Sequence, residues 1–198
     1  MQVIFFSGLI LPVLILGAES RDTWQQPDKV VEIIGIKPGM VIGEPGAGRG
    51  FYTFRLARKV GPAGKIYAND IVEKDLNHIK KRAKKEGFKN IVTIKGEIKD
   101  PLFPVNELDM VFMSYVLHDL DRPAAFLKNL RAYLKPDTPL VILEQSPEKT
   151  GETWHFWKKE KILKTLKSAG YRLERIENFL PKDNIYFFYM EYGPGPGN

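Results

Sequence analysis

The segment from residue 41 to residue 50, VIGEPGAGRG, limits the possible folds of this 198-residue chain more than any other segment. A short apolar run ends at the acid Glu44, and glycines follow at alternate positions, Gly46, Gly48 and Gly50. Residues 51–60 then form an apolar stretch compatible with a helix. Because glycine lacks a Cβ atom, such a turn lets backbone approach a ligand and lets a helix pack closely on a strand. The segment therefore predicts a strand, a tight glycine turn and a helix.

A second short strand that ends in an acid follows this unit. Residues 65–70, KIYAND, come after a Gly-Pro turn, and Asp70 lies 20 residues beyond Gly50. In a strand–helix–strand unit this distance delivers a carboxylate to the edge of the sheet where ribose hydroxyls bind. We therefore expect Asp70 to bind the ribose of a nucleoside-containing cofactor.

The rest of the chain keeps alternating between helix and strand patterns. Strands are expected at 91–94, 108–114 and 140–144, and helices at 73–87, 121–134 and 158–169. The last two strand-like runs, 171–176 and 185–192, are joined by a loop too short for a crossover helix, so they must be antiparallel. These patterns predict an α/β fold in which a mostly parallel sheet ends in an antiparallel hairpin.

The acid-x-Gly-x-Gly-x-Gly spacing, followed by Asp70, resembles the first motif of the class I S-adenosylmethionine-dependent methyltransferases. The resemblance covers residues 27–192 and implies a Rossmann-like sheet of seven strands in the order 3-2-1-4-5-7-6, with the last strand antiparallel and helices on both faces. It implies S-adenosyl-L-methionine as the cofactor. The residues expected to bind this cofactor are Glu44, Gly46, Ala47, Gly48, Gly50, Asp70, Ile71, Glu97, Ile98 and Ser114.

A nicotinamide dinucleotide is the alternative ligand for a glycine turn followed by an acid. Its fingerprint, Gly-x-Gly-x-x-Gly, does not fit, because the third glycine would fall on Phe51. A dinucleotide also brings a pyrophosphate, which a charged Glu44 would repel. The sequence thus favours a methyltransferase. A second function that it allows is a catalytically inactive adenosylmethionine-binding protein of the same fold.

Several residues bear on the reaction. The chain has no cysteine, which excludes a cysteine nucleophile. Its histidines and carboxylates show no metal-ligand spacing, so no metal site is expected. We expect His118, after the fourth strand, to be a general base, with a structural histidine paired with Asp119 as the alternative. Tyr115, His155 and Trp157 are the expected acceptor-binding residues, with interhelical packing as the alternative for the last two.

Composition and length narrow the class of partner. The net charge of +6 arises partly from a cluster of basic residues between 80 and 89, which alternates with apolar residues on an expected helix. This pattern is typical of a solvated helix face, and without interleaved exposed aromatics it does not favour nucleic acid. A domain of this size has no room for an inserted substrate domain, which favours a small-molecule acceptor, either free or envelope-associated.

The N-terminal segment is apolar from residue 3 to residue 18 apart from Ser7, which is short for a membrane span. Its length suits a signal peptide or an uncleaved anchor, although no Lys or Arg precedes it. We therefore divide the chain into a signal peptide or membrane anchor at 1–20, a methyltransferase domain at 21–192 and a disordered tail at 193–198. The expected location is extracytoplasmic or membrane-attached, or cytoplasmic if the assigned start is wrong. The sequence indicates no oligomeric state.

Overall fold

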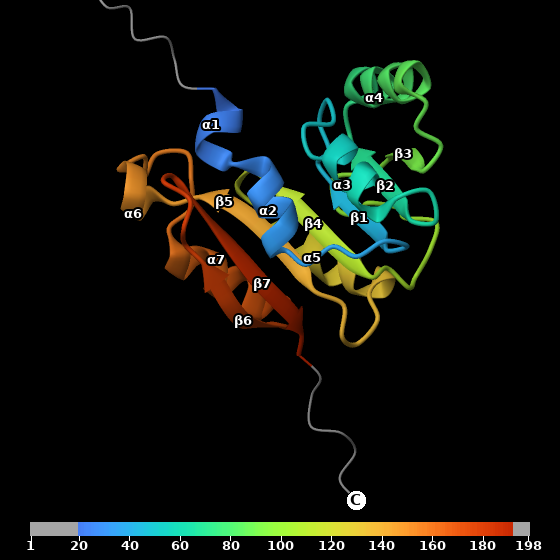
Figure 1. Cartoon of the computed structure of the whole chain (residues 1–198). Coiled ribbons are helices and arrows are strands. Elements are labelled where there is room, and N and C mark those ends of the chain that lie inside the picture. Colours follow the sequence, from blue (N-terminus) through green and yellow to red (C-terminus); the bar gives the residue numbers. More distant parts are fainter. Residues whose placement is uncertain (1–19, 192–198) are drawn as a thin grey trace, which may run out of the picture.

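The computed structural model describes residues 20–191, which build a central seven-stranded sheet in the order β3-β2-β1-β4-β5-β7-β6 (Figure 1). β7 is antiparallel to both of its neighbours, β5 and β6, and the other strand pairs are parallel. The order and the final hairpin confirm the predicted fold class. The strands are β1 (Val41–Pro45), β2 (Lys65–Asp70), β3 (Ile91–Lys95), β4 (Met110–Ser114), β5 (Leu140–Gln145), β6 (Tyr171–Glu177) and β7 (Asp183–Met190).

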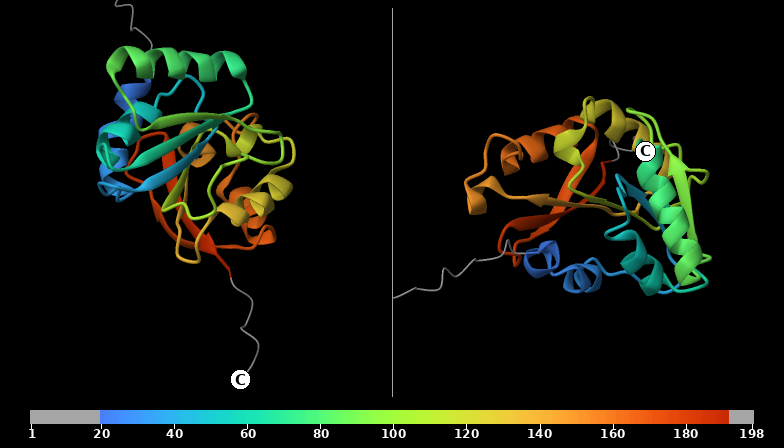
Figure 2. Two further views of the ribbon diagram at one scale, coloured as in Figure 1. Left: turned by 90° about the vertical axis from the view of Figure 1, so that its right-hand side faces the viewer. Right: turned by 90° about the horizontal axis from the view of Figure 1, so that it is seen from above.

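Helices cover both faces of this sheet (Figure 2). On one face, α2 (Pro27–Ile33), α3 (Thr53–Val60) and α4 (Glu73–Glu86) share an apolar cluster with Phe112 of β4. On the other face, α5 (Pro123–Leu130) and α7 (Lys159–Ser168) pack with Met113, the next residue of the same strand. Successive strand residues point to opposite faces, so an unbroken apolar strand serves two cores at once.

Some element boundaries differ from those expected. The helix expected at 121–134 is shorter: α5 ends at Leu130 and passes into a 3-10 turn, η2 (Arg131–Tyr133). The fourth strand begins at Met110, while Leu108 forms only an isolated bridge with Leu134. Sequence patterns do not indicate the short helix α1 (Arg21–Gln25). Gln26, which has a φ of 44°, separates α1 from α2. The remaining short elements are η1 (Leu117–Asp119) and α6 (Pro147–Thr150).

The expected signal or anchor segment and the expected tail lie outside the described residues, apart from Ser20 at the end of the first segment. Within residues 20–191, no helix is both long and apolar enough to cross a membrane.

The strand order places a ligand site between β1 and β4. From β1 the chain continues to β2 and β3 on one side, whereas β4 and β5 build the sheet on the other side. In open α/β sheets, ligands bind beyond the carboxyl ends of the strands at such a reversal of order. The glycine turn follows β1, and residues 115–121 follow β4, so both segments meet at this edge.

Candidate active site

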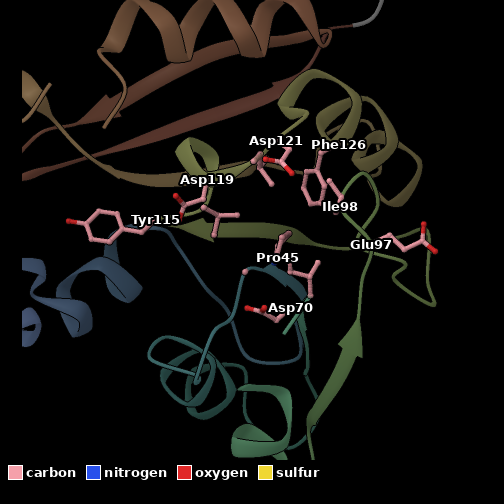
Figure 3. A pocket seen from close by; sticks show the side chains of 12 residues that line it. Pro45, Asp70, Glu97, Ile98, Tyr115, Asp119, Asp121 and Phe126 are labelled. Carbon is pink, nitrogen blue, oxygen red and sulfur yellow. The ribbon is translucent and has the colours of Figure 1, made fainter. Parts of the chain in front are cut away.

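A pocket of about 310 Å³ opens at this edge of the sheet (Figure 3). Its volume is at the lower end of the roughly 300–1,000 Å³ typical of small-molecule sites. Tyr115 and Glu97 lie at its opposite ends in the close-up view. Six of the predicted site residues line it: Gly46, Asp70, Ile71, Glu97, Ile98 and Tyr115. The fold thus brings together residues that are far apart in the sequence.

The glycine turn has the backbone conformation that its sequence predicts. Gly46, Gly48 and Gly50 have φ angles of 68°, 52° and 86°. A Cβ atom on Gly46 would lie only 2.2 Å from Cγ2 of Val116, so this glycine permits close contact between the turns after β1 and β4. A Cβ on Gly48 would meet no atom of the described residues within 4 Å. Gly48 is therefore favoured by its backbone angle and not by crowding.

Asp70 joins the glycine turn to the pocket. One carboxylate oxygen accepts a hydrogen bond from the Gly48 amide at 2.8 Å, and the other accepts from the Val72 amide at 2.9 Å. A carboxylate offers about four lone-pair positions, so both oxygens can still accept from a ligand. This arrangement fits the expected ribose role and adds a second one, which is to hold the turn in place.

The pocket combines apolar walls with carboxylates. Ile71 and Ile98 line it although 55% and 52% of their surfaces are exposed, which suits a flat apolar ligand group such as adenine. Among residues 20–191, the pocket lining contains no Lys or Arg. Its four carboxylates belong to Asp70, Glu97, Asp119 and Asp121. Such a site favours a cationic sulfonium and opposes a pyrophosphate.

Glu44 lies beneath the glycine turn and outside the pocket lining. Its side chain is buried, and Thr53 Oγ1 donates a hydrogen bond of 2.6 Å to it. Burial raises the pKa of Glu44 to about 8, with the Thr53 hydrogen bond and Arg21 opposing this effect. Glu44 is consequently protonated in large part at neutral pH. The repulsion of phosphate expected from Glu44 is therefore supplied by the four carboxylates of the pocket.

The raised pKa predicts a stability effect of Glu44→Gln. At pH values between the ordinary carboxyl pKa of 4.5 and about 8, the unfolded chain releases the Glu44 proton while the folded chain keeps it. The protonated Glu44 therefore contributes to the free energy of unfolding at low pH, and this stabilisation is lost as pH rises. Glutamine has no such proton and can still accept from Thr53. We expect the variant to lose less stability than the parent between about pH 5 and about pH 8, by a few kcal/mol at most.

Thermal unfolding of both proteins across this pH range measures the effect, and the exposed Glu107→Gln is the matched control. Parallel pH curves for the parent and Glu44→Gln would show that Glu44 ionises normally in the folded protein.

His118 forms a close pair with Glu144 of β5. Its Nδ1 lies 2.6 Å from Glu144 Oε2, and its side chain is only 4% exposed. Glu144 Oε1 also accepts from the amides of Val116 and Leu117, at 3.1 and 2.8 Å. Burial lowers the pKa of His118, but the hydrogen bond and charge of Glu144, with Asp119, outweigh burial and raise that pKa above its ordinary value.

His118 reaches the pocket through its neighbour and does not line it. Its Nε2 lies 3.6 Å from an Asp119 carboxylate oxygen, and Asp119 does line the pocket. A histidine whose Nδ1 is held by a carboxylate presents its Nε2 as a base, which is the arrangement of many acid–base catalysts. The structure thus adds Glu144 as the main partner of His118, whereas the sequence suggested only Asp119.

His155 and Trp157 lie outside this pocket. Both line a separate hollow on the loop between α6 and α7. The His155 ring packs against that of His118 with centroids 4.6 Å apart, and Trp157 packs against the apolar cluster of α5 and α7 and beneath Lys161. Trp157 thus makes the interhelical packing contacts of the alternative, whereas His155 makes ring contacts next to the His118–Glu144 pair.

The end of β4 is tied to α1. Arg21 donates a hydrogen bond of 2.9 Å to Ser114 Oγ, and its guanidinium lies over the Phe51 ring, 4.2 Å from the centroid. Tyr115 has an unusual φ of 58°, and its hydroxyl donates to the buried carboxylate of Asp183. Sequence reasoning missed Arg21 and Asp183 because only the fold brings them next to the strand end. It named Asp119 only as a partner of His118 and did not assign Asp119 or Asp121 to the pocket, although both lie within seven residues of the end of a predicted strand.

The fold and pocket together define a class I S-adenosylmethionine-dependent methyltransferase domain. Residues 36–177 match a family model described as a methyltransferase domain, and the chain belongs to this family. S-adenosyl-L-methionine is the methyl donor of the class, and the apolar walls, the carboxylates and the position of Asp70 fit it. The nicotinamide alternative is thereby excluded.

Similar proteins agree with this assignment. A demethylmenaquinone methyltransferase of Lactococcus lactis is 30% identical over 67% of this chain and 52% of its own length. One of Bacillus subtilis is 27% identical over 69% of this chain and 58% of its own. The chain thus spans about half the length of the curated relatives that it matches.

Solved structures share the whole fold. A SAM-dependent methyltransferase from Aquifex aeolicus is 28% identical and superimposes with a TM-score of 0.79, covering 86% of this chain and 94% of that one. The [4+2]-cyclase SpnF reaches a TM-score of 0.74 at 15% identity, covering 89% and 86%. Because a cyclase has the same fold, the fold alone does not specify the reaction.

Proposed function

We propose that the chain transfers the methyl group of S-adenosyl-L-methionine to a small-molecule acceptor, a hydroquinone of the demethylmenaquinone type. The observation that carries this proposal is the pocket between β1 and β4. Its Asp70 and Ile98 suit an adenosine, and its other end, at Tyr115 and Asp119, remains for the methionyl part and the acceptor. The names of the relatives supply the acceptor class.

The chemistry is an in-line displacement at the sulfonium methyl group. An oxidised quinone ring is electron-poor, whereas a hydroquinone that has lost a hydroxyl proton can attack through its ring carbon. The bond from carbon to methyl forms as the bond from sulfur to methyl breaks, and the ring carbon then loses its proton. S-adenosylhomocysteine leaves, and the protein has to align the reactants and accept a proton.

We assign the proton-accepting role to the His118–Glu144 pair. Glu144 holds the Nδ1 side of the imidazole, and Asp119, 3.6 Å from Nε2, lines the pocket. Apolar lining residues, among them Val116, Leu120 and Phe126, suit a ring system. Orientation by Glu144 fixes which nitrogen of His118 carries the proton, which is the usual contribution of a buried carboxylate to such a pair.

Asp70→Ala tests the cofactor site. We expect it to weaken S-adenosylmethionine binding by several-fold to a few hundred-fold, because hydrogen bonds to a charged group contribute about 1–3 kcal/mol. The variant also loses the anchor for the Gly48 and Val72 amides. Calorimetric titration measures the affinity, and Asp137→Ala, in an exposed turn, is the control. Unchanged affinity in folded Asp70→Ala would refute the ribose assignment.

The acceptor is tested with radiolabelled S-adenosylmethionine and a reduced, short-chain demethylmenaquinone. Formation of labelled menaquinol, the reduced product, is the expected result, and the oxidised quinone is the control that should accept no methyl group. Tight cofactor binding without transfer to this compound or to cell-envelope extracts would instead support the catalytically inactive adenosylmethionine-binding protein.

We further propose that residues 1–18 bring the domain to a membrane, where a lipid quinone would be found. The support is the apolar composition of residues 3–18. Fractionation of cells that express the chain with and without these residues tests the idea. Equal recovery of both forms in the soluble fraction would contradict it.

A further inference from the structure

Two histidines and an aspartate gather beside the pocket. His118, Asp119 and His155 each offer one ligand atom, and these atoms all lie within 4.8 Å of one another. His155 is 37 residues from His118 in the sequence, on the loop between α6 and α7, so no local spacing of ligands announces the cluster. Asp119, labelled in Figure 3, belongs both to the cluster and to the pocket lining.

One distance in this cluster is close to that between two ligands of a small metal ion. His118 Nε2 and the Asp119 carboxylate oxygen are 3.6 Å apart. Two ligands of a tetrahedral zinc ion, at bonds of about 2.0–2.1 Å, are separated by about 3.3 Å. The ligand atoms of the cluster lie within 4.8 Å of one another, and rotation of the exposed Asp119 and His155 side chains would bring them to this spacing, because neither side chain is held in a buried position.

Glu144 supplies the outer support that metal-binding histidines commonly have. It lies 2.6 Å from Nδ1 of His118, which leaves Nε2 as the nitrogen facing Asp119. A carboxylate in this position fixes the tautomer and orientation of the ring and makes it a stronger ligand. Glu144 is itself fixed by the amides of Val116 and Leu117, so one half of the cluster is preorganised.

We propose that His118 Nε2, Asp119 and His155 bind one divalent transition-metal ion of the zinc type. Two imidazoles and one carboxylate are ligands for zinc, nickel, cobalt or ferrous iron rather than for magnesium or calcium, which prefer oxygen alone. Three protein ligands leave a coordination position open, as in metal sites that bind water or substrate. The ion would sit between the pocket and the loop that carries His155.

The ion and a proton would compete for the same lone pair on His118. A bound ion would therefore remove His118 from proton transfer and slow a reaction that depends on it. This consequence rests on the proposed function, whereas the metal site itself does not, so metal binding is measured without any methyl acceptor.

The test uses untagged full-length protein stripped with a chelator and titrated with zinc by calorimetry and with cobalt by visible spectroscopy. One ion per chain and a cobalt spectrum of nitrogen and oxygen ligation in low coordination are expected. His155→Ala, at an exposed position, should weaken zinc binding at least about 100-fold, and Glu144→Gln, through loss of the outer support, by about 10–100-fold.

His78→Ala is the matched control, because it removes the third histidine of the chain, which lies on α4 beside Arg49. Its zinc affinity should equal that of the parent. The absence of stoichiometric binding, or equal affinity in His155→Ala and the parent, would overturn the site. A loss of binding in His78→Ala as large as that in His155→Ala would overturn it as well.

Discussion

His118→Ala is expected to lower methyl transfer by about 10²–10⁴-fold, the usual contribution of a general base. The imidazole is the titratable group that Glu144 orients, and it lies one residue from the pocket lining. S-adenosylmethionine affinity should change little, because Asp70 and the walls of the pocket remain. Single-turnover transfer to the reduced quinone, measured with chelator present, gives the rate. Calorimetry on the same sample gives the affinity.

A second variant separates chemistry from folding. His118→Ala leaves the Glu144 carboxylate buried with only its two backbone donors, which should also lower the melting temperature. Glu144→Gln keeps the shape, but its amide group would favour the other His118 tautomer, so it should slow transfer while His118 is still present. Full activity in both folded variants would assign the pair to structure alone.

The matched control for the rate is His78→Ala, which changes a histidine far from β4 in the sequence and on a different helix. It should transfer methyl groups at the parental rate. If its rate fell as far as that of His118→Ala, the loss would reflect general damage to the protein and would not support a base at His118.

The fold could be predicted because its signals are local. The glycine turn, the acid at Asp70 and the apolar run of β4 each depend on neighbours in the sequence, and together they indicate a doubly covered, mostly parallel sheet, whose strand order follows from the family resemblance. The short helix α1 carries no comparable pattern. It is held by Arg21 against Ser114 and Phe51, contacts that only the folded chain creates.

The pocket position of the residues expected to bind the cofactor could be predicted for the same reason, and the partner of His118 could not. Gly46, Asp70, Glu97 and Ile98 follow strand ends, where position in the sequence determines position at the sheet edge. The partner of His118, in contrast, is Glu144 on the neighbouring strand β5. Its role depends on register and burial, which a pattern of residue types does not specify.

Gly46→Ala is expected to have the largest effect on the pocket itself. The added Cβ would lie 2.2 Å from Cγ2 of Val116 and 3.2 Å from its Cβ, at a φ of 68°. Overpacking costs about 1–3 kcal/mol and positive φ a further 1–2 kcal/mol, so we expect a loss of about 2–5 kcal/mol in the free energy of unfolding. Denaturant unfolding measures this loss.

Cofactor binding should be lost along with this stability, because both Gly46 and Val116 line the pocket and must move apart. Gly39→Ala is the matched control: φ is 88° there, and the new Cβ would meet no described atom within 4 Å, so only the backbone cost applies. Gly48→Ala, at an equally open position, should resemble Gly39→Ala in stability.

Combining Gly46→Ala with Val116→Ala should restore part of the stability, since the 2.2 Å contact disappears while the contact of 3.2 Å remains. Equal stability of Gly46→Ala and Gly39→Ala would contradict this explanation. It would show that the close approach of the turns after β1 and β4 does not require glycine at position 46.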